Sequence, residues 1–247
     1  MKKFTQLSYK QRPGFTFKQF HVAHDGCAMK VGTDGILLGA WCALQQSQRI
    51  LDVGCGSGLI ALMLAQRSAE HVLIDAIDID ADAVHQAQQN VQHSPWVTRI
   101  QVMQKDIVNA NIALAYYDHL VSNPPFFVHG QSFVDERRAI ARQTGTLTHQ
   151  QLLARAAELL VEDGLLSVIL PMNAGEQLSR LACQQGWWVS RATEVITKAG
   201  QRVPHRLLLE LCRVPKVTQY ECLSLYQSDG TYSTAYQHLC RDFYLKM

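Results

Sequence analysis

The sequence predicts a doubly wound α/β fold around a seven-stranded, mostly parallel β-sheet. From residue 49 onward, short apolar segments typical of buried strands alternate with amphipathic segments of helical period. A glycine-rich turn follows the first of these strands, where open α/β sheets bind their ligands. We therefore expect helices on both faces of the sheet and a ligand site at the carboxyl ends of its strands.

The expected strands and helices follow one another along most of the chain. Strands are expected at 49–53, 71–77, 100–104, 119–122, 165–170, 187–196 and 205–213, and helices at 59–67, 80–92, 149–161 and 176–185. The last two strands have no helix between them, so they should form an antiparallel hairpin at the edge of the sheet. Residues 1–48 should form a short N-terminal extension of the same domain, whose body is 49–247.

The composition excludes several classes of protein. The chain is 47% hydrophobic and 18% charged, as is usual for a soluble globular protein. Its apolar stretches are far shorter than the roughly 20 residues that cross a bilayer, and no apolar run follows the lysines at its start. The seven cysteines are scattered without a C-x-x-C pair, and the ten histidines show no ligand spacing. We expect a cytoplasmic monomer with free thiols, no membrane contact and no bound metal.

The charges are unevenly distributed along the chain. The net charge of +2 is too small to identify a nucleic-acid-binding protein. Residues 1–30 nevertheless carry six basic side chains against one acid, and 198–216 carry five against one, whereas 49–122 is acidic. A positive rim around an acidic centre suits a polyanionic partner outside and a cationic cofactor inside. An ordinary solvated surface explains the same charges equally well.

The glycine-rich turn favours one class of cofactor over another. It contains Gly54, Gly56 and Gly58, spaced G-x-G-x-G and preceded by Asp52. A dinucleotide-binding turn would be G-x-G-x-x-G, with its third glycine at the position of Leu59. The observed spacing is the form used by enzymes that bind S-adenosylmethionine, and Asp52 could face the ammonium group of that cofactor.

Acidic residues follow the next two expected strands. Asp78 ends the second strand, where an acid can accept hydrogen bonds from both ribose hydroxyls of a cofactor. Asp80 is the alternative, although it fits better as the cap of the following helix. Asp106 follows the third strand and is placed to accept from the adenine amino group, or else it is only a turn or capping residue.

The fourth strand is followed by Asn123, Pro124, Pro125 and Phe126. The two prolines stiffen the backbone at the carboxyl end of the strand. The Asn123 side-chain oxygen and the Pro124 carbonyl could hold the two hydrogens of a planar amine, while Phe126 stacks on its ring. Such a site would make the amine nitrogen a better nucleophile. A simple strand-terminating turn is the alternative.

These motifs together resemble the class I, Rossmann-like amino-methyltransferases that act on adenine or on glutamine amides. Within that family, the stretch 15–41, the sequence PHRLLLEL from Pro204 and the sequence FYLKM from Phe243 are similar to enzymes that methylate N6 of adenine in tRNA, so the resemblance covers nearly the whole chain. It implies that Asn123, Pro124, Pro125 and Phe126 form the catalytic motif, with Asn123 also beside the cofactor. It further implies that the segment before position 41 lines the cofactor site, through Lys30, Thr33 and Asp34.

The basic residues of two segments are the expected contacts to RNA: Lys2, Lys3, Arg12, Lys18, Arg137 and Arg138. The long polar segment 128–147 is expected to be partly disordered alone and to fold over a nucleotide, although a plain solvated loop is a close alternative.

Other functions remain to be weighed. A protein-glutamine methyltransferase would share the same motif, but the basic N-terminus and the lack of an N-terminal helical domain argue against it. A methyltransferase of adenine in rRNA or DNA, a nicotinamide-dependent oxidoreductase and a non-catalytic RNA-binding module are the further alternatives. Leu59 counts against the oxidoreductase, and the complete Asn123–Phe126 motif against the non-catalytic module.

Overall fold

The computed structural model describes residues 9–25, 30–44, 47–124, 147–200 and 203–246. The larger sheet contains eight described strands: β3 (Arg49–Val53), β4 (Leu73–Asp78), β5 (Ile100–Gln104), β6 (Tyr117–Ser122), β7 (Leu160–Pro171), β8 (Trp188–Lys198), β9 (Arg206–Cys212) and β10 (Gln219–Tyr226). The described helices are α1 (Thr33–Trp41), α2 (Leu59–Arg67), α3 (Ala81–Gln92), α5 (His149–Leu159), α6 (Met172–Gln184) and α7 (Thr234–Cys240). The N-terminal segment adds a 3-10 helix (Tyr9–Gln11) and a small sheet of β1 (Gly14–Thr16) and β2 (His21–Ala23).

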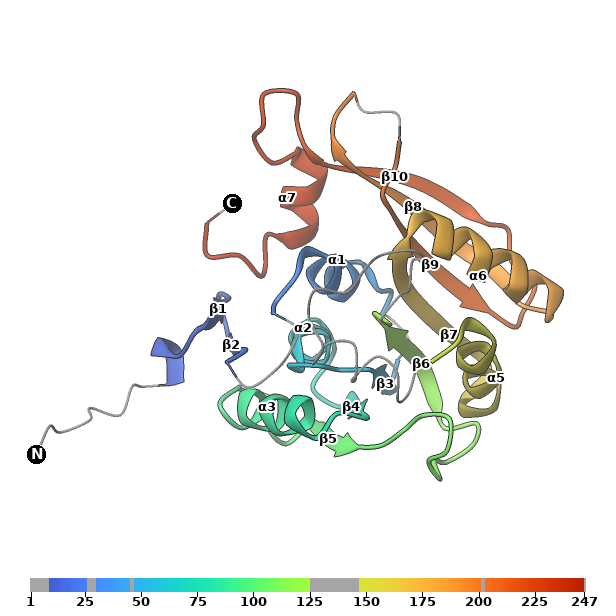
Figure 1. The fold of residues 1–247 in the computed structure, drawn as a ribbon, viewed down its shortest axis with the longest axis horizontal. Helices are drawn as coiled ribbons and strands as arrows, with labels where there is room; N and C mark the ends of the chain where they lie inside the picture. The colour runs from blue at the N-terminus through green and yellow to red at the C-terminus, as the bar shows by residue number, and fades with distance from the viewer. Residues whose placement is uncertain (1–8, 26–29, 45–46, 125–146, 201–202, 247) are drawn as a thin grey trace, which may run out of the picture.

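The predicted doubly wound α/β fold is confirmed (Figure 1). The strand order in the larger sheet is β10-β8-β9-β7-β6-β3-β4-β5. Among the described strands of the larger sheet, β9 alone runs antiparallel to all of its neighbours. The order reverses at β3, which lies between β4 and β6. Such a reversal creates the crevice in which this class of sheet binds ligands.

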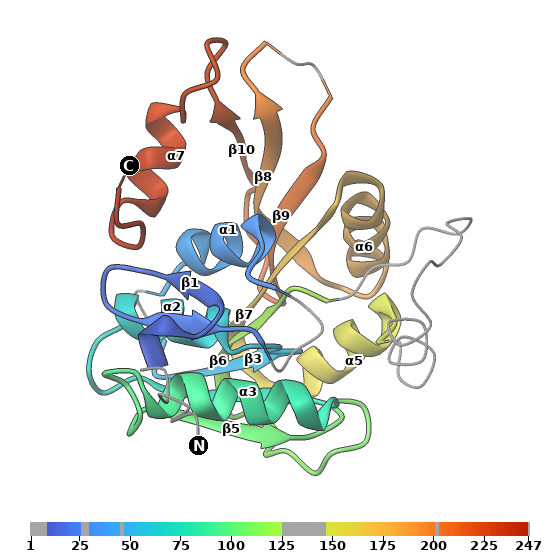
Figure 2. The ribbon, with the colours of Figure 1, turned by 60° about the vertical axis from the view of Figure 1, so that its left-hand side comes forward.

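Two apolar cores cover the two faces of the sheet (Figure 2). The strands are buried on both sides, so successive residues enter different cores. In β3, for example, Ile50 packs with residues of α1, α2 and α3, whereas Leu51 packs with residues of α5 and α6. Helix α2 is covered by the sheet and by α1, and its residues from Leu59 to Ala65 are all buried. This burial explains why its sequence is apolar all round rather than on one stripe.

The structure corrects the predicted sheet at one edge. The strands expected at 187–196 and 205–213 do form an antiparallel pair, β8 and β9. They are not at the edge, because β10 continues the sheet parallel to β8 and makes eight strands rather than seven. The sequence of β10 concealed it, since the first half of the strand is exposed and only Leu223 and Leu225 are buried. A half-exposed edge strand lacks the apolar run by which the buried strands were recognised.

The helices also differ from expectation in several places. Helices α1 and α7 lie where no helix was predicted. Helix α5 begins as expected, with a capping box between Thr148 and Gln151, but it ends at Leu159. Asp163 and Gly164, which were expected to stop the helix, instead belong to β7.

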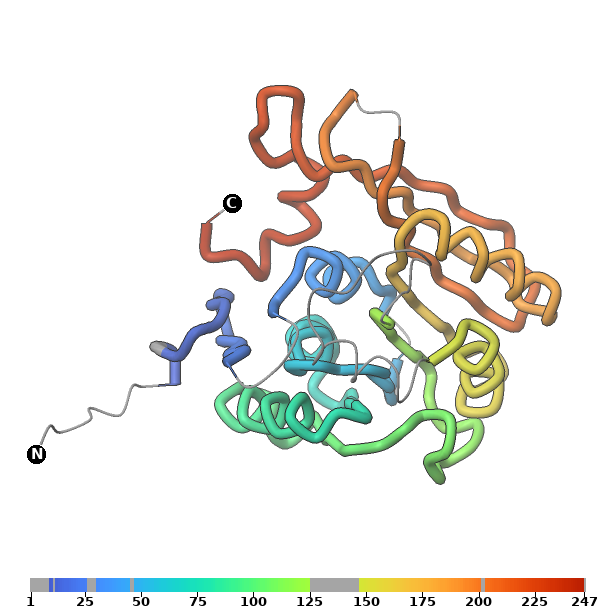
Figure 3. Tube along the Cα trace, viewed as in Figure 1, coloured from blue at the N-terminus to red at the C-terminus, as the bar shows by residue number. Residues whose placement is uncertain are grey.

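The N-terminal hairpin of β1 and β2 packs against the segment that follows α7 (Figure 3). The Lys18 backbone N–H donates to the Phe243 carbonyl at 2.8 Å, and the rings of Phe17 and Phe243 lie edge to face with centroids 6.5 Å apart. The hairpin also lies beside α3. None of the helices in the described ranges has the length and apolar character needed to span a bilayer.

Candidate functional site

The strand register brings the sequence motifs to one edge of the sheet. In β3, Val53 is the partner of Ile77 in β4 and of Ser122 in β6. The next residues, Gly54, Asp78 and Asn123, therefore lie side by side. Asp78 is paired with Gln104, the last residue of β5, and Asp106 comes two residues after Gln104. Asp106 therefore also lies near this end of the sheet. We call this end of the sheet the carboxyl edge.

The glycine loop, residues 54–58, turns over the end of β4. The backbone N–H groups of Gly54 and Cys55 both donate to the Ile77 carbonyl, at 2.8 and 3.0 Å. Gly54, Gly56 and Gly58 have φ angles of 72°, 54° and 78°, a region that residues with a Cβ rarely adopt. A Cβ at Gly54 or Gly56 would meet no described atom within 4 Å, so these positions leave open space beside the backbone.

Gly58 is a glycine for a second reason, because a Cβ there would lie 3.2 Å from the Ala87 Cβ of α3. Gly58→Ala should therefore destabilise the fold by roughly 2–3 kcal/mol, through the left-handed backbone together with this contact. Gly186→Ala is a matched control, because Gly186 has the same φ of 78° and no neighbour within 4 Å. It should cost only about 1 kcal/mol. Urea denaturation measures both values, and equal losses would show that the contact with Ala87 is unimportant.

Asp52 lies fully buried beneath the glycine loop. Its Oδ2 accepts a hydrogen bond of 3.0 Å from the Ala61 backbone N–H in α2. Its Oδ1 has no hydrogen-bond partner among the described residues. Burial raises the pKa of Asp52 to about 7, with the Ala61 N–H opposing this rise and the nearby Asp78 carboxylate adding to it. A buried carboxylate with an unused oxygen fits a cationic group of a ligand.

Asp78 is held against the glycine loop. Its Oδ2 accepts from the Gly56 N–H at 2.8 Å, and its Oδ1 accepts from the Asp80 N–H at 3.0 Å. Burial raises the pKa of Asp78. Each carboxylate oxygen has a further lone pair, so the group can still accept from ligand hydroxyls. The expected role of Asp80 is confirmed, because it caps α3 by accepting from the Asp82 N–H at 2.9 Å.

Asp106 is engaged within its own turn. Its Oδ1 accepts from the Val108 N–H at 2.9 Å, and its Oδ2 accepts from the Asn109 side chain at 2.7 Å. Arg155 holds the same turn from α5 by donating to the carbonyls of Ile107 and Ala110. The structure thus gives Asp106 the turn role that was considered as its alternative, and its role toward a cofactor stays a prediction.

Asn123 and Pro124 follow directly after β6. Asn123 is half-buried and Pro124 is buried. The Ser122 hydroxyl, fully buried, donates to the Val53 carbonyl at 2.9 Å and fixes the end of β6 to β3. This bond places Asn123 beside the glycine loop. The remaining expected residues of the motif and its loop lie outside the described residues: Pro125, Phe126, Arg137, Arg138 and nearly all of 128–147.

The residues expected near the methionine end of a cofactor lie at or before the start of α1. Lys30 and Thr33 are exposed. Asp34 forms an ion pair with Arg206, whose Nε lies 2.8 Å from its Oδ2. Arg206 begins β9 and is paired with Pro171, which ends β7 at the carboxyl edge. The ion pair therefore fixes the start of α1 at that edge, a role for Arg206 that the sequence did not reveal.

The basic residues expected to contact RNA differ in how the structure places them. Lys2 and Lys3 lie outside the described residues. Lys18 is exposed, and its Nζ donates to the Arg241 carbonyl at 2.5 Å. The Arg12 guanidinium is bound to both Asp25 oxygens and to the Gln89 side chain. Arg12 is thus committed to holding the N-terminal segment on α3, a contact that the sequence did not indicate.

The family model and the sequence relatives that this chain matches are methyltransferases, and a solved structure shares its fold. The model of the methyltransferase small domain matches residues 31–178. A protein of Yersinia enterocolitica named tRNA1(Val) (adenine(37)-N6)-methyltransferase is 49% identical, over 94% of this chain and 92% of its own. A protein of the same name from Tolumonas auensis is 48% identical, over 94% and 97%. Among solved structures, one described as a predicted O-methyltransferase from Agrobacterium tumefaciens has a TM-score of 0.68 at 17% identity, covering 85% of this chain and 96% of its own.

Proposed function

Since the chain belongs to the family of tRNA1(Val) (adenine(37)-N6)-methyltransferases, we infer that it transfers a methyl group from S-adenosylmethionine to N6 of adenine 37 in tRNA1(Val). The observation that carries this inference is the register of β3 with β6, which sets the glycine loop beside Asn123. A cofactor over the loop and an amine at Asn123 would then be neighbours. The family names support the choice of tRNA over the alternative substrates, rRNA, DNA and a protein glutamine.

The residues of the carboxyl edge fit S-adenosylmethionine. The unused Oδ1 of the buried Asp52 suits the cationic amino-acid end of that molecule, and the open space at Gly54 and Gly56 admits it to the backbone. Asp78 would accept from the ribose hydroxyls, and Asp106 would turn toward the adenine. When bound, S-adenosylmethionine supplies a methyl group on a positively charged sulfur, already activated for transfer.

The chain's own contribution is to hold the target amine. The Asn123 side-chain oxygen and the Pro124 carbonyl accept from the two amine hydrogens and draw the nitrogen lone pair out of conjugation with the ring. Phe126 stacks on the base, which must leave its own stack to reach the site. The transfer does not require a general base with a shifted pKa at its start. Positioning of the amine therefore accounts for most of the rate acceleration.

We place residues 1–48 in the same domain as 49–247, because the N-terminal hairpin packs on α3 and on the segment after α7. We also propose that the enzyme acts as a monomer without a metal ion, since its chemistry requires neither a second chain nor a Lewis acid. The six described cysteines are free, which supports a location in the reducing cytoplasm, where tRNA is modified.

RNA binding should depend on salt through the exposed cations of the N-terminal segment. Lys18→Ala should reduce the slope of log K against log salt concentration by about 1, because one phosphate contact is lost. Lys216→Ala is the matched control, since Lys216 is an exposed lysine between β9 and β10 and is not among the expected contacts to RNA. Its slope should equal that of the wild type. Filter binding of tRNA at several salt concentrations measures both, and an unchanged slope for Lys18→Ala would contradict the assignment.

The proposed function is tested by mass spectrometry of tRNA nucleosides from cells that lack this protein. N6-methyladenosine should disappear from position 37 of tRNA1(Val) and return when the gene is restored. Transfer of a labelled methyl group by the purified protein then separates the alternatives. Labelling of a protein glutamine or of DNA, without labelling of tRNA, would overturn the proposal.

A further inference from the structure

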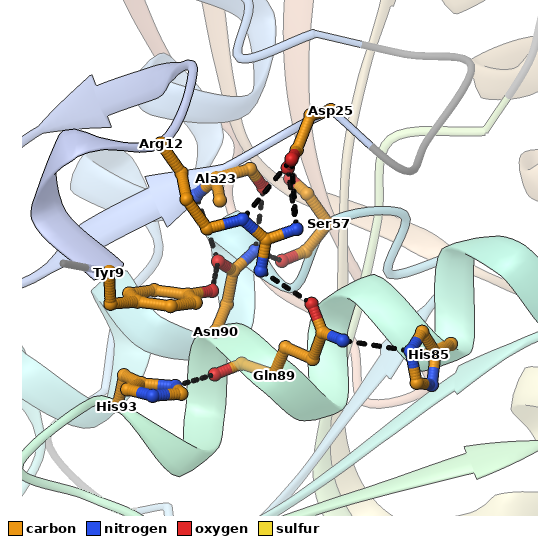
Figure 4. Close-up of polar contacts among 9 residues, drawn as sticks. All are labelled: Tyr9, Arg12, Ala23, Asp25, Ser57, His85, Gln89, Asn90 and His93. Carbon is orange, nitrogen blue, oxygen red and sulfur yellow. Dashed lines mark hydrogen bonds and ion pairs between the residues drawn. The ribbon is translucent and has the colours of Figure 1, made fainter. Parts of the chain in front are cut away.

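The side chain of Asn90, near the end of α3, joins two parts of the molecule that are distant in sequence (Figure 4). It is 1% exposed. Its Oδ1 accepts from the Ala23 N–H at 2.8 Å and from the Tyr9 hydroxyl, and its Nδ2 donates to the carbonyls of Ala23 and Ser57 at 2.9 and 2.7 Å. An asparagine amide can accept two hydrogen bonds and donate two. All four are used here.

The contact with Ser57 reaches the centre of the glycine loop. Ser57 lies between Gly56 and Gly58, and its carbonyl belongs to the peptide that leads into Gly58. Fixing this carbonyl fixes the orientation of that peptide. Ala87, one turn before Asn90 on the same face of α3, lies so near Gly58 that a Cβ added there would be 3.2 Å from the Ala87 Cβ. Helix α3 therefore sets the shape of the loop at two adjacent points.

The contacts with Ala23 and Tyr9 belong to the N-terminal arm, by which we mean residues 9–25. Asn90 bonds both the N–H and the carbonyl of Ala23, as a neighbouring strand would. Burial raises the pKa of the Tyr9 phenol to about 12, so its hydroxyl is a donor at neutral pH. Tyr9 also stacks on His93 with ring centroids 3.8 Å apart. The arm is thus seated on α3 around Asn90.

Arg12 also holds the N-terminal arm on α3. Its guanidinium bridges Asp25, at the end of the arm, to Gln89, the residue before Asn90. Figure 4 shows the Tyr9 hydroxyl directed at the Asn90 amide and the Arg12 guanidinium between Asp25 and Gln89. The hydrogen bonds of the Asn90 side chain thus reach both the arm and the glycine loop.

We infer that Asn90 is a positioning residue that couples the docking of the N-terminal arm to the shape of the glycine loop. This inference rests on the proposed function, in which the loop holds S-adenosylmethionine and the arm contacts RNA. Docking of the arm fixes Asn90, and Asn90 then holds the loop in the form that binds the cofactor. Because coupling between two binding sites is reciprocal, RNA bound to the arm and the cofactor bound to the loop strengthen each other's binding.

The test uses the full chain and isothermal titration with S-adenosylmethionine in the absence of RNA. Asn90→Asp keeps the Oδ1 acceptor but sets an oxygen against the carbonyls of Ala23 and Ser57, so the dissociation constant should rise about ten-fold. Tyr9→Phe keeps the ring on His93 and removes only the hydroxyl. It should raise the constant about three-fold, although Tyr9 makes no described contact with the loop. Gln88→Ala, an exposed position on the same helix whose side chain faces Val102, is the control and should change nothing.

Kinetics distinguish positioning from simple loss of stability. In both variants the KM for S-adenosylmethionine should rise while kcat at saturating cofactor stays within about two-fold of the wild type, because the loop alone is disturbed. Partial unfolding would lower kcat and leave KM unchanged, and that result would overturn the inference. Wild-type affinity in Tyr9→Phe would also overturn it, whether or not Asn90→Asp folds. A wild-type chain that does not bind S-adenosylmethionine would instead overturn the proposed function, and this inference with it.

Discussion

Replacing Asn123 by alanine should lower kcat about 100- to 1,000-fold, corresponding to roughly 3–4 kcal/mol in the barrier. Asn123 lies beside the glycine loop and is half-buried after β6, so truncating it removes an acceptor without opening the core. The loss should fall on kcat rather than on the KM for tRNA, because the acceptor acts chiefly when the amine nitrogen changes its geometry. Single-turnover methylation of tRNA1(Val) under saturating conditions measures it.

The control for this variant is Asn111→Ala, at an exposed asparagine in the segment before β6. It removes the same group from the surface and should leave kcat unchanged. Thermal melting of both variants should match the wild type, which shows that the fold is intact. A normal rate in Asn123→Ala would refute the proposed role of the asparagine in holding the amine.

The second large effect concerns Asp52. Asp52→Asn should weaken binding of S-adenosylmethionine at pH 8 by roughly ten- to a hundred-fold, since a hydrogen bond to a charged group contributes about 1.5–3 kcal/mol. The same substitution should stabilise the protein without cofactor. The wild type must bury a carboxylate whose Oδ1 has no described partner, whereas asparagine carries no charge.

The raised pKa of Asp52 determines how the stability of the protein should change with pH. Burial raises the pKa of Asp52 to about 7 in the folded state, against about 3.9 when unfolded. Between these values the folded protein holds the extra proton, so the free energy of unfolding falls as the pH rises from 4 to 7. The total loss is at most roughly 4 kcal/mol. Asp52→Asn should abolish this fall.

Urea denaturation at pH 5 and pH 8 measures the difference, with Asp229→Asn as the control. Hydrogen bonds from Thr231 lower the pKa of the exposed Asp229, so its contribution to stability is present at neutral pH and is lost as the pH falls. Asp229→Asn should therefore leave unchanged the fall in the free energy of unfolding that occurs as the pH rises. If the free energy of unfolding depends on pH in the same way in Asp52→Asn and in the wild type, the pKa of Asp52 is not raised as described above.

The sequence predicted those elements whose burial leaves a simple pattern. The short apolar segment 49–53 predicts β3, and four of its five residues are buried in the structure. The cap at Asp80 and the amphipathic period predict α3. Helix α1 was missed because it is buried on almost every side and contains two glycines, so it shows no polar stripe. Strand β10 was missed for the opposite reason, since half of it is exposed.

Some residues of the candidate site could likewise be predicted from the sequence, and others could not. The glycine loop, Asp52 and Asp78 were found because each is next in sequence to a recognisable strand. Arg206 and Asn90 were not, because their partners lie far away along the chain. Arg206 pairs with Asp34 across 172 positions, and Asn90 meets Ala23 across 67. A single sequence carries no local signal for such pairings.

The hairpin of β1 and β2 packs in part on residues that are made long after it. Lys18 and Arg241 are 223 positions apart, and Phe17 packs on Phe243. At ribosomal rates of about 5–20 residues per second, the hairpin waits roughly 10–45 s for its partner. During that interval Phe20 can already pack on Trp96, whereas Phe17 still lacks the ring of Phe243 and is open to chaperones. The surface proposed to contact tRNA is therefore completed only after residues 241–243 have been made.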